Sequence, residues 1–185
     1  MRNNRKRYLK LTTTAVFIAL TCILTMTVSI PTPTKGYLNL GDCAVLIGGW
    51  LLGPLWGTVA GGLGSALADF FSGYPLYIPG TLLIKSLMAL TAALAHYLFS
   101  GNKNRHPRAG FLIGAAFAET LMVAGYYLYE AVVIGEGFGA ALTGVSGNVV
   151  QGIAGAAGAF LFVEILSRTD VVRVFGVSGF EKTRI

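Results

Sequence analysis

Long uncharged apolar runs dominate the chain, and short polar patches separate them. The runs at 11–34, 43–68 and 137–163 contain no Asp, Glu, Lys or Arg. Each is long enough to cross the hydrocarbon core of a bilayer, which takes about 20 helical residues. The pattern therefore predicts an all-α integral membrane protein.

Charged residues, glycines and prolines divide the apolar sequence into six segments. They run at about 10–30, 41–52, 55–71, 79–99, 110–134 and 138–166. The second segment is short, because twelve helical residues cover only about 18 Å of a core about 30 Å thick. Gly53 and Pro54 could therefore separate two spans or kink a single one.

The basic residues decide between these two topologies. The chain has 14 Lys and Arg against 8 Asp and Glu. They gather in three patches, at 1–10, 101–108 and beyond 167. Six spans place 12 of the 14 basic residues in the cytoplasm, whereas five spans would leave 5 inside and 8 outside. Because basic residues are enriched on the cytoplasmic side, we expect six transmembrane helices with both termini cytoplasmic.

The same pattern predicts one membrane domain with two short extensions. Residues 1–9 form a basic cytoplasmic N-terminus, 10–166 the six-helix domain and 167–185 a basic cytoplasmic tail. Only 12% of the residues are charged, against about 25% in soluble domains. A basic soluble protein would suggest nucleic-acid binding, but clusters beside apolar spans are typical of membrane topology instead. We expect a multi-pass protein of a prokaryotic plasma membrane.

Polar residues within the apolar segments fall at one membrane depth, toward the outer side. They are Asn39, Asp42, Asp69, Tyr74, Tyr77, Lys85, Tyr126, Tyr127, Glu130, Asn148 and Gln151. Amides and a carboxylate can bind ring nitrogens and hydroxyls, while aromatic faces can stack. The cluster predicts an outward-facing pocket for a small heteroaromatic ligand. Interhelical hydrogen bonding is the alternative role for Asn148 and Gln151.

Segment five carries an acidic face. Glu119, Tyr126 and Glu130 follow at i, i+7 and i+11, close to one line along a helix. Glu119 lies well inside the predicted span, where a charge costs at least about 2.5 kcal/mol unless it is paired or hydrated. Lys85 is the basic residue at comparable depth, so we weigh an ion pair with Glu119, Glu130 or Asp69 against direct ligand contact. The two roles are compatible, because an ion pair can also line a pocket.

Support for an enzyme is weak. Residues 144–147 match the Gly-x-Ser-Gly motif of rhomboid proteases, but the same motif recurs at 176–179. His96 is predicted most of a membrane thickness away from Ser146. Lys85-Ser86 lacks the preceding glycine of a phosphate loop, and the cysteines and histidines have no metal-site spacing. We expect no catalytic residues, no metal and no cofactor.

Three stretches, at 36–90, 119–131 and 147–155, resemble the substrate-binding S components of energy-coupling-factor (ECF) vitamin transporters. They contain Asn-Leu-Gly-Asp, Ala-Asp-x-x-Ser-Gly-Tyr and Gly-Tyr-x-x-Tyr-Glu, in the family's order. The resemblance is strongest to the subgroup associated with hydroxymethylpyrimidine, a thiamin precursor, and pyridoxine. It implies a six-helix bundle with cytoplasmic termini and a substrate site toward the outer face.

The resemblance also implies particular residues and partners. The implied substrate-binding residues are Asn39, Asp42, Tyr77, Lys85, Glu119, Tyr126, Glu130, Asn148 and Gln151. Ala15 and Ala19 match an Ala-x-x-x-Ala pattern that packs on the transmembrane T component, although such a pair also suits ordinary helix packing. The implied mechanism is vitamin binding from outside without energy input, then docking on a T component with two cytoplasmic ATPases.

Three alternatives remain at this point. The ligand could be another vitamin, such as riboflavin, pantothenate or folate, because one fold serves different ligands. The chain could instead be an intramembrane enzyme or a ligand-free assembly protein.

Overall fold

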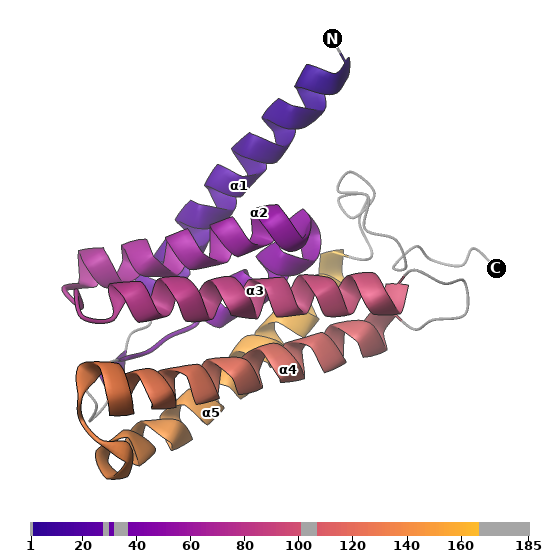
Figure 1. Ribbon diagram of the computed structural model, residues 1–185. Helices are drawn as coiled ribbons and strands as arrows, with labels where there is room; N and C mark the ends of the chain where they lie inside the picture. Colours follow the sequence, from indigo (N-terminus) through magenta and orange to yellow (C-terminus); the bar gives the residue numbers. More distant parts are fainter. Residues whose placement is uncertain (1, 28–29, 32–36, 101–106, 167–185) are drawn as a thin grey trace.

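Helices account for nearly all of the computed structural model, which describes residues 2–27, 30–31, 37–100 and 107–166 (Figure 1). The helices are α1 (Arg2–Thr27), α2 (Gly41–Ser72), α3 (Ile78–Ser100), α4 (Pro107–Leu128), the π-helix η1 (Tyr129–Ile134) and α5 (Phe138–Leu166). Two short strands, β1 (Ile30–Pro31) and β2 (Tyr37–Leu38), pair antiparallel. The predicted cytoplasmic tail at 167–185 lies outside the described residues.

Five helical stretches are long and apolar enough to cross a membrane. They are Arg7–Thr27, Gly41–Ser72, Ile78–Phe99, Arg108–Ile134 and Phe138–Leu166. The predicted segments one, four, five and six each correspond to one of them. Because α1 begins at Arg2, most of the predicted N-terminal extension is helical and continuous with the first stretch.

The second and third predicted segments form one element, α2, which is interrupted in its middle. Gly53 has φ 80° and ψ −176°, and Pro54 follows it. A Cβ added to Gly57 would lie 2.5 Å from the Cα of Gly49, and one added to Gly61 would lie 3.0 Å from Cγ1 of Val45. Residues eight apart in a straight helix are about 12 Å apart. The two halves therefore fold back on each other as an antiparallel pair, with the turn at the right in Figure 1.

Because α2 folds back on itself, the number of long helices need not equal the number of membrane crossings. The two halves of α2 make one stretch by length and composition. Six membrane crossings remain a prediction. They would require each half of α2 to cross the membrane separately.

Glycines bring neighbouring helices into close contact. A Cβ on Gly49 would lie 2.4 Å from the main-chain oxygen of Ala89 on α3, and one on Gly64 would lie 2.7 Å from that of Ile18 on α1. Gly110 likewise lies against Phe99. Small residues of this kind let helix backbones approach in lipid.

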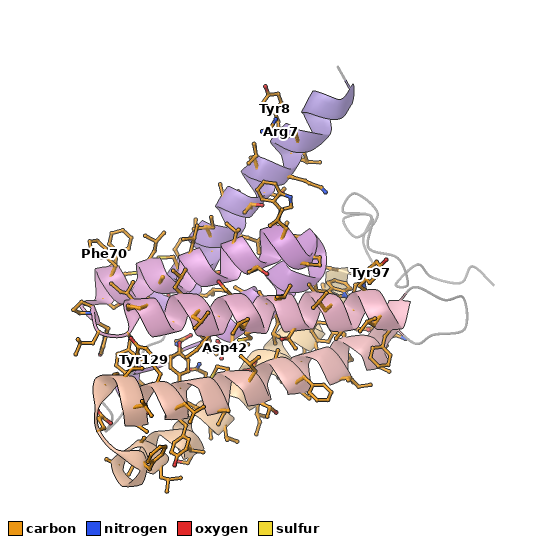
Figure 2. All side chains as sticks on the ribbon, viewed as in Figure 1. Arg7, Tyr8, Asp42, Phe70, Tyr97 and Tyr129 are labelled. Carbon is orange, nitrogen blue, oxygen red and sulfur yellow. The ribbon has the colours of Figure 1, made fainter. Side chains whose placement is uncertain are left out.

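The outside of the bundle is apolar. Leu83, Phe117 and Ile153 are each more than 60% exposed, and Figure 2 shows Phe70 projecting away from the helices. A soluble domain does not expose so many large apolar side chains. This apolar surface is therefore suited to contact with lipid.

Polar side chains gather toward one end of the bundle. At that end lie the turn from α2 into α3, and η1 with the turn into α5, both at the left in Figure 1, whereas α2 begins further inside the bundle. The α2 turn and the end of α5 lie at the opposite end. We call the first of these the η1 end.

Candidate functional site

Five charged side chains are buried in the described part of the chain. They are Asp42, Asp69, Lys85, Glu119 and Glu130, each less than 9% exposed. A buried charge is expensive in a membrane bundle and commonly marks a functional site. These residues therefore define the candidate site, together with the uncharged polar groups that contact them.

Asp42 is the centre of a network that joins three helices. It is the second residue of α2 and is completely buried, and Figure 2 shows it between α3 and α4. Lys85 of α3 makes an ion pair with its Oδ1, and Nε2 of Gln151 on α5 donates to its Oδ2 at 2.8 Å. The Lys85 ammonium also lies 5.4 Å from the ring centroid of Tyr126 on α4, a cation–π distance. Both oxygens of Asp42 are therefore in use.

Gln151 also holds the segment that precedes α2. The main-chain N–H of Asn39 donates to Oε1 of Gln151 at 2.7 Å. The side-chain Oδ1 of Asn39 accepts a bond of 2.8 Å from the N–H of Gly41, the pattern of an Asx turn. One amide thus ties both Asn39 and Asp42 to α5.

The predicted partner of Lys85 was wrong. We expected Glu119, Glu130 or Asp69, but the ion pair is with Asp42. The expectation failed because it compared depths along separate spans. The start of α2 lies inside the bundle rather than at its rim, and this places Asp42 within reach of α3.

Glu119 lies beside Asp42 but accepts no hydrogen bond from any described residue. Its side chain is 8% exposed, and both carboxylate oxygens are buried. A Cβ on Gly152 would lie 3.0 Å from Oε2, and one on Gly155 would lie 3.1 Å from Oε1 and 2.7 Å from Cβ of Asp42. The carboxylate therefore lies against two glycines of α5, which bring no side-chain donor to it.

A group of hydroxyls and rings lies closer to the η1 end. The hydroxyl of Tyr77 donates to Oε1 of Glu130 at 3.2 Å, and Tyr126 shares a 3.0 Å hydrogen bond with Thr81. The Tyr77 ring centroid is 6.4 Å from that of Tyr126 and 6.3 Å from that of Tyr129. Figure 2 labels Tyr129 at this end. Tyr126 connects this group to the Asp42 network through its contact with Lys85.

The acidic residues of the fifth predicted segment lie on two types of helix, Glu119 on an α-helix and Glu130 on a π-helix. The α-helix ends at Leu128 and η1 begins at Tyr129. A π-turn has more residues than an α-turn, so Glu130 does not lie where the α-helical repeat from Glu119 would place it. Glu119, Tyr126 and Glu130 are nevertheless all buried. The π-helix has no signature in the hydropathy pattern, and such segments are frequent at functional sites.

Apart from Asn39, which is half-buried, the predicted site residues are thus buried in the same bundle, but Lys85 has a different partner from those predicted. Asn148 is 8% exposed and lies one turn before Gln151 on α5. Sequence reasoning missed Thr81, which is buried and lies one turn before Lys85. A threonine at that spacing from an intramembrane lysine was the available signal. Ligand contact by these residues stays a prediction.

The protease-like motif does not form a dyad. Ser146 is exposed on α5, while Nδ1 of His96 accepts a 2.6 Å hydrogen bond from the indole of Trp50. Trp50 also packs edge to face on Phe111. His96 therefore belongs to an aromatic cluster of α2, α3 and α4.

Ala15 and Ala19 are both exposed on α1. The side of α1 that packs on the rest of the chain carries Thr14 and Thr21, both buried. The two alanines therefore do not form a close helix contact within the described residues.

Comparisons with known proteins agree with this architecture. A family model described as "ECF-type riboflavin transporter, S component" matches residues 6–168. A protein of Pyrococcus woesei described as "Uncharacterized protein in gap 3'region" is 37% identical over 134 residues, which cover 72% of this chain and 84% of that protein. The "Thiamine precursor transporter HmpT" of Lactococcus lactis subsp. cremoris is 27% identical over 174 residues, which cover 93% and 96%.

The family match spans all five membrane-length helices. Proteins of this family are transporter subunits of the plasma membrane and not enzymes. The chain is therefore a multi-pass membrane protein that belongs to the family of ECF-type transporter S components.

Proposed function

We propose that this protein binds a small water-soluble vitamin or vitamin precursor from the outside and delivers it to an ECF-type importer. The ligand that we favour is hydroxymethylpyrimidine or a similar heteroaromatic compound. The Lactococcus relative described as a thiamine precursor transporter supports this choice, because it aligns over nearly the whole chain. Riboflavin is the second candidate, since it appears in the description of the matching family.

The buried network around Asp42 is the observation that carries this proposal. A scaffold protein gains nothing from burying four acids and one base among helices that otherwise face lipid. A ligand-binding subunit needs such groups, because a few well-placed polar side chains fix the orientation of a ligand. The aromatic rings near the η1 end offer surfaces for stacking a heteroaromatic ring.

We further propose six membrane crossings with both termini in the cytoplasm. The two halves of α2 run antiparallel, so each can cross separately. This topology places the η1 end outside, and the end of α3 and the start of α4 inside with the basic patch at 101–108, in agreement with the positive-inside bias. The short first half of α2 is shielded by neighbouring helices, since residues 44–51 are buried. Backbone that does not span the whole core is tolerated only in such a protected position.

A binding scan tests the ligand proposal. Purified protein in detergent is titrated with hydroxymethylpyrimidine, pyridoxine, riboflavin, pantothenate and folate, and heat is measured. We expect one of them to bind, and we expect Glu130→Ala and Asn148→Ala to weaken that binding at least tenfold. Glu164→Ala, at the opposite end of α5, is the control and should bind normally. Absence of binding to all five compounds would contradict the proposal.

Docking on a T component is proposed to use the exposed face of α1 that carries Ala15 and Ala19. Ala15→Trp and Ala19→Trp should abolish vitamin uptake by cells that supply the T component and the two ATPases, with ligand binding unchanged. Val16→Trp is a matched control, because Val16 is also exposed on α1 but lies outside the alanine pair. Uptake that survives both alanine substitutions would contradict this role for α1.

A further inference from the structure

We infer that Tyr129 is a positioning residue. It ties η1 to the turn between α2 and α3, and it thereby keeps the carboxyl group of Glu130 inside the bundle. This role rests on the proposed function, in which Glu130 contacts the ligand. Tyr129 itself lies outside the predicted substrate-binding set.

Most of η1 is not held to the other helices by burial. Only Glu130 and Ala131 are buried in it, whereas Val132 and Val133 are each more than 60% exposed on the lipid-facing surface. A π-helix is also a rare form of backbone, found mostly as a short interruption of an α-helix. Particular contacts therefore have to fix the position of η1.

Two consecutive residues of η1 bond to two consecutive residues of the turn between α2 and α3. The hydroxyl of Tyr129 donates to the main-chain oxygen of Leu76 at 2.7 Å. The next residue, Glu130, accepts the 3.2 Å bond from the hydroxyl of Tyr77 through its Oε1. The turn is ordered at this point, because the N–H of Tyr77 donates to the oxygen of Tyr74 at 3.0 Å. These two bonds fasten the start of η1 to the turn.

The ring of Tyr129 packs on α3 where a glycine leaves room for it. A Cβ added to Gly80 would lie 2.7 Å from three ring atoms, Cε1, Cε2 and Cζ. Figure 2 places Tyr129 between α3 and α4. The ring therefore rests on the first turns of α3, while the hydroxyl reaches the segment just before that helix.

These contacts matter for Glu130 because its buried position is costly. Its side chain is 3% exposed, and an ionisable group inside a membrane bundle is expensive to keep there. Glu130 directly follows Tyr129, so a shift of Tyr129 also moves the backbone of Glu130. Losing the contact with Leu76 lowers the fraction of molecules that hold Glu130 in place. The apparent affinity for a ligand falls by the same factor.

Amide hydrogen exchange of the ligand-free protein in detergent tests the contact itself. Tyr129→Phe keeps the ring and removes the hydroxyl. We expect the amides of Glu136 and Gly137, which donate to carbonyl oxygens of η1, to exchange about fivefold faster, which corresponds to about 1 kcal/mol for one neutral hydrogen bond. Tyr97→Phe is the matched control: it makes the same change near the opposite end of α3, at a side chain that is 73% exposed, and should leave this exchange unchanged.

Calorimetric titration tests the consequence for binding, with hydroxymethylpyrimidine, riboflavin and the other three compounds of the binding scan as probes. We expect Tyr129→Phe to weaken binding by about two- to fivefold. Gly80→Ala should weaken it at least as much, because its Cβ displaces the ring from the α3 side. In a Glu130→Ala background neither substitution should weaken binding further, since no carboxyl group is left to position. Tyr97→Phe should bind normally.

The outcomes separate this role from the proposed function. Exchange in Tyr129→Phe within about 1.5-fold of the wild type would overturn the contact as a tie on η1, whether or not a ligand binds. Unchanged affinity in Tyr129→Phe, or losses that add in full to that of Glu130→Ala, would overturn the positioning of Glu130 while the transporter proposal stands. A wild type that binds none of the five compounds would remove the proposed function and the binding role of Tyr129 together.

Discussion

The ion pair between Lys85 and Asp42 allows a quantitative test of the buried network. Lys85 is 2% exposed and Asp42 is fully buried. Removing one partner of a buried pair leaves an uncompensated charge and typically costs about 3–5 kcal/mol. Lys85→Met would leave Asp42 with only the amide of Gln151. Asp42→Asn would leave the charge of Lys85 without its paired counter-charge, beside the Tyr126 ring.

Each single substitution should therefore lower the melting temperature by about 6–20 °C, at roughly 2–4 °C per kcal/mol for a chain of this size. The double variant removes both charges and keeps an acceptor for Gln151. It should be more stable than the sum of the single effects implies, by roughly 2–3 kcal/mol, because contacting residues do not add.

Thermal unfolding in detergent, followed by tryptophan fluorescence and far-ultraviolet circular dichroism, measures all four proteins of this cycle. Trp50 and Trp56 both belong to α2 and provide the fluorescence signal. The reasoning would be refuted if either single variant melted within about 2 °C of the wild type, or if the double variant lost the full sum of the two single effects.

Three further results are expected from stability and binding measurements on single variants. Gly155→Ala should weaken ligand binding and lower the melting temperature, because its Cβ would lie 2.7 Å from Cβ of Asp42. Gly158→Ala is the control and should be tolerated, because its Cβ would meet only a 3.4 Å contact with Cys43. Equal effects of the two substitutions would argue against close packing of α5 on Asp42. Gly57→Ala should destabilise the protein by at least about 2 kcal/mol in thermal unfolding, since its Cβ would lie 2.5 Å from the facing half of α2. Arg108→Ala should cost no more than about 1 kcal/mol, because its bidentate pair with Glu164 is exposed; a larger loss would show that this pair clamps α4 to α5.

The hydropathy pattern predicted most of the helical framework correctly. The segment predicted at 138–166 has the bounds of α5, and that at 79–99 lies one residue inside each end of α3. Such boundaries are set by charges, glycines and prolines that end apolar runs, so they are local and visible in the sequence. The interruption at Gly53 was visible for the same reason.

The parts that could not be predicted depend on contacts between helices. The pairing of Lys85 with Asp42 requires the start of α2 to enter the bundle, which no local pattern indicates. Every residue type in the π-helix that carries Glu130 also occurs in α4, so composition does not distinguish the two. Thr81 and Tyr126 meet across two helices, and neither residue alone signals the bond.

The buried acids link the stability of this protein to its proposed task. Glu119 lacks a donor among the described residues, so the ligand-free state keeps a cost that a bound ligand can remove. A ligand at 100 times its dissociation constant stabilises the protein that binds it by about 2.7 kcal/mol. This gain would be comparable to the cost of one uncompensated polar group in the bundle. In a membrane domain with so few charges, an acid without a partner is therefore better explained by what the protein binds than by how it folds.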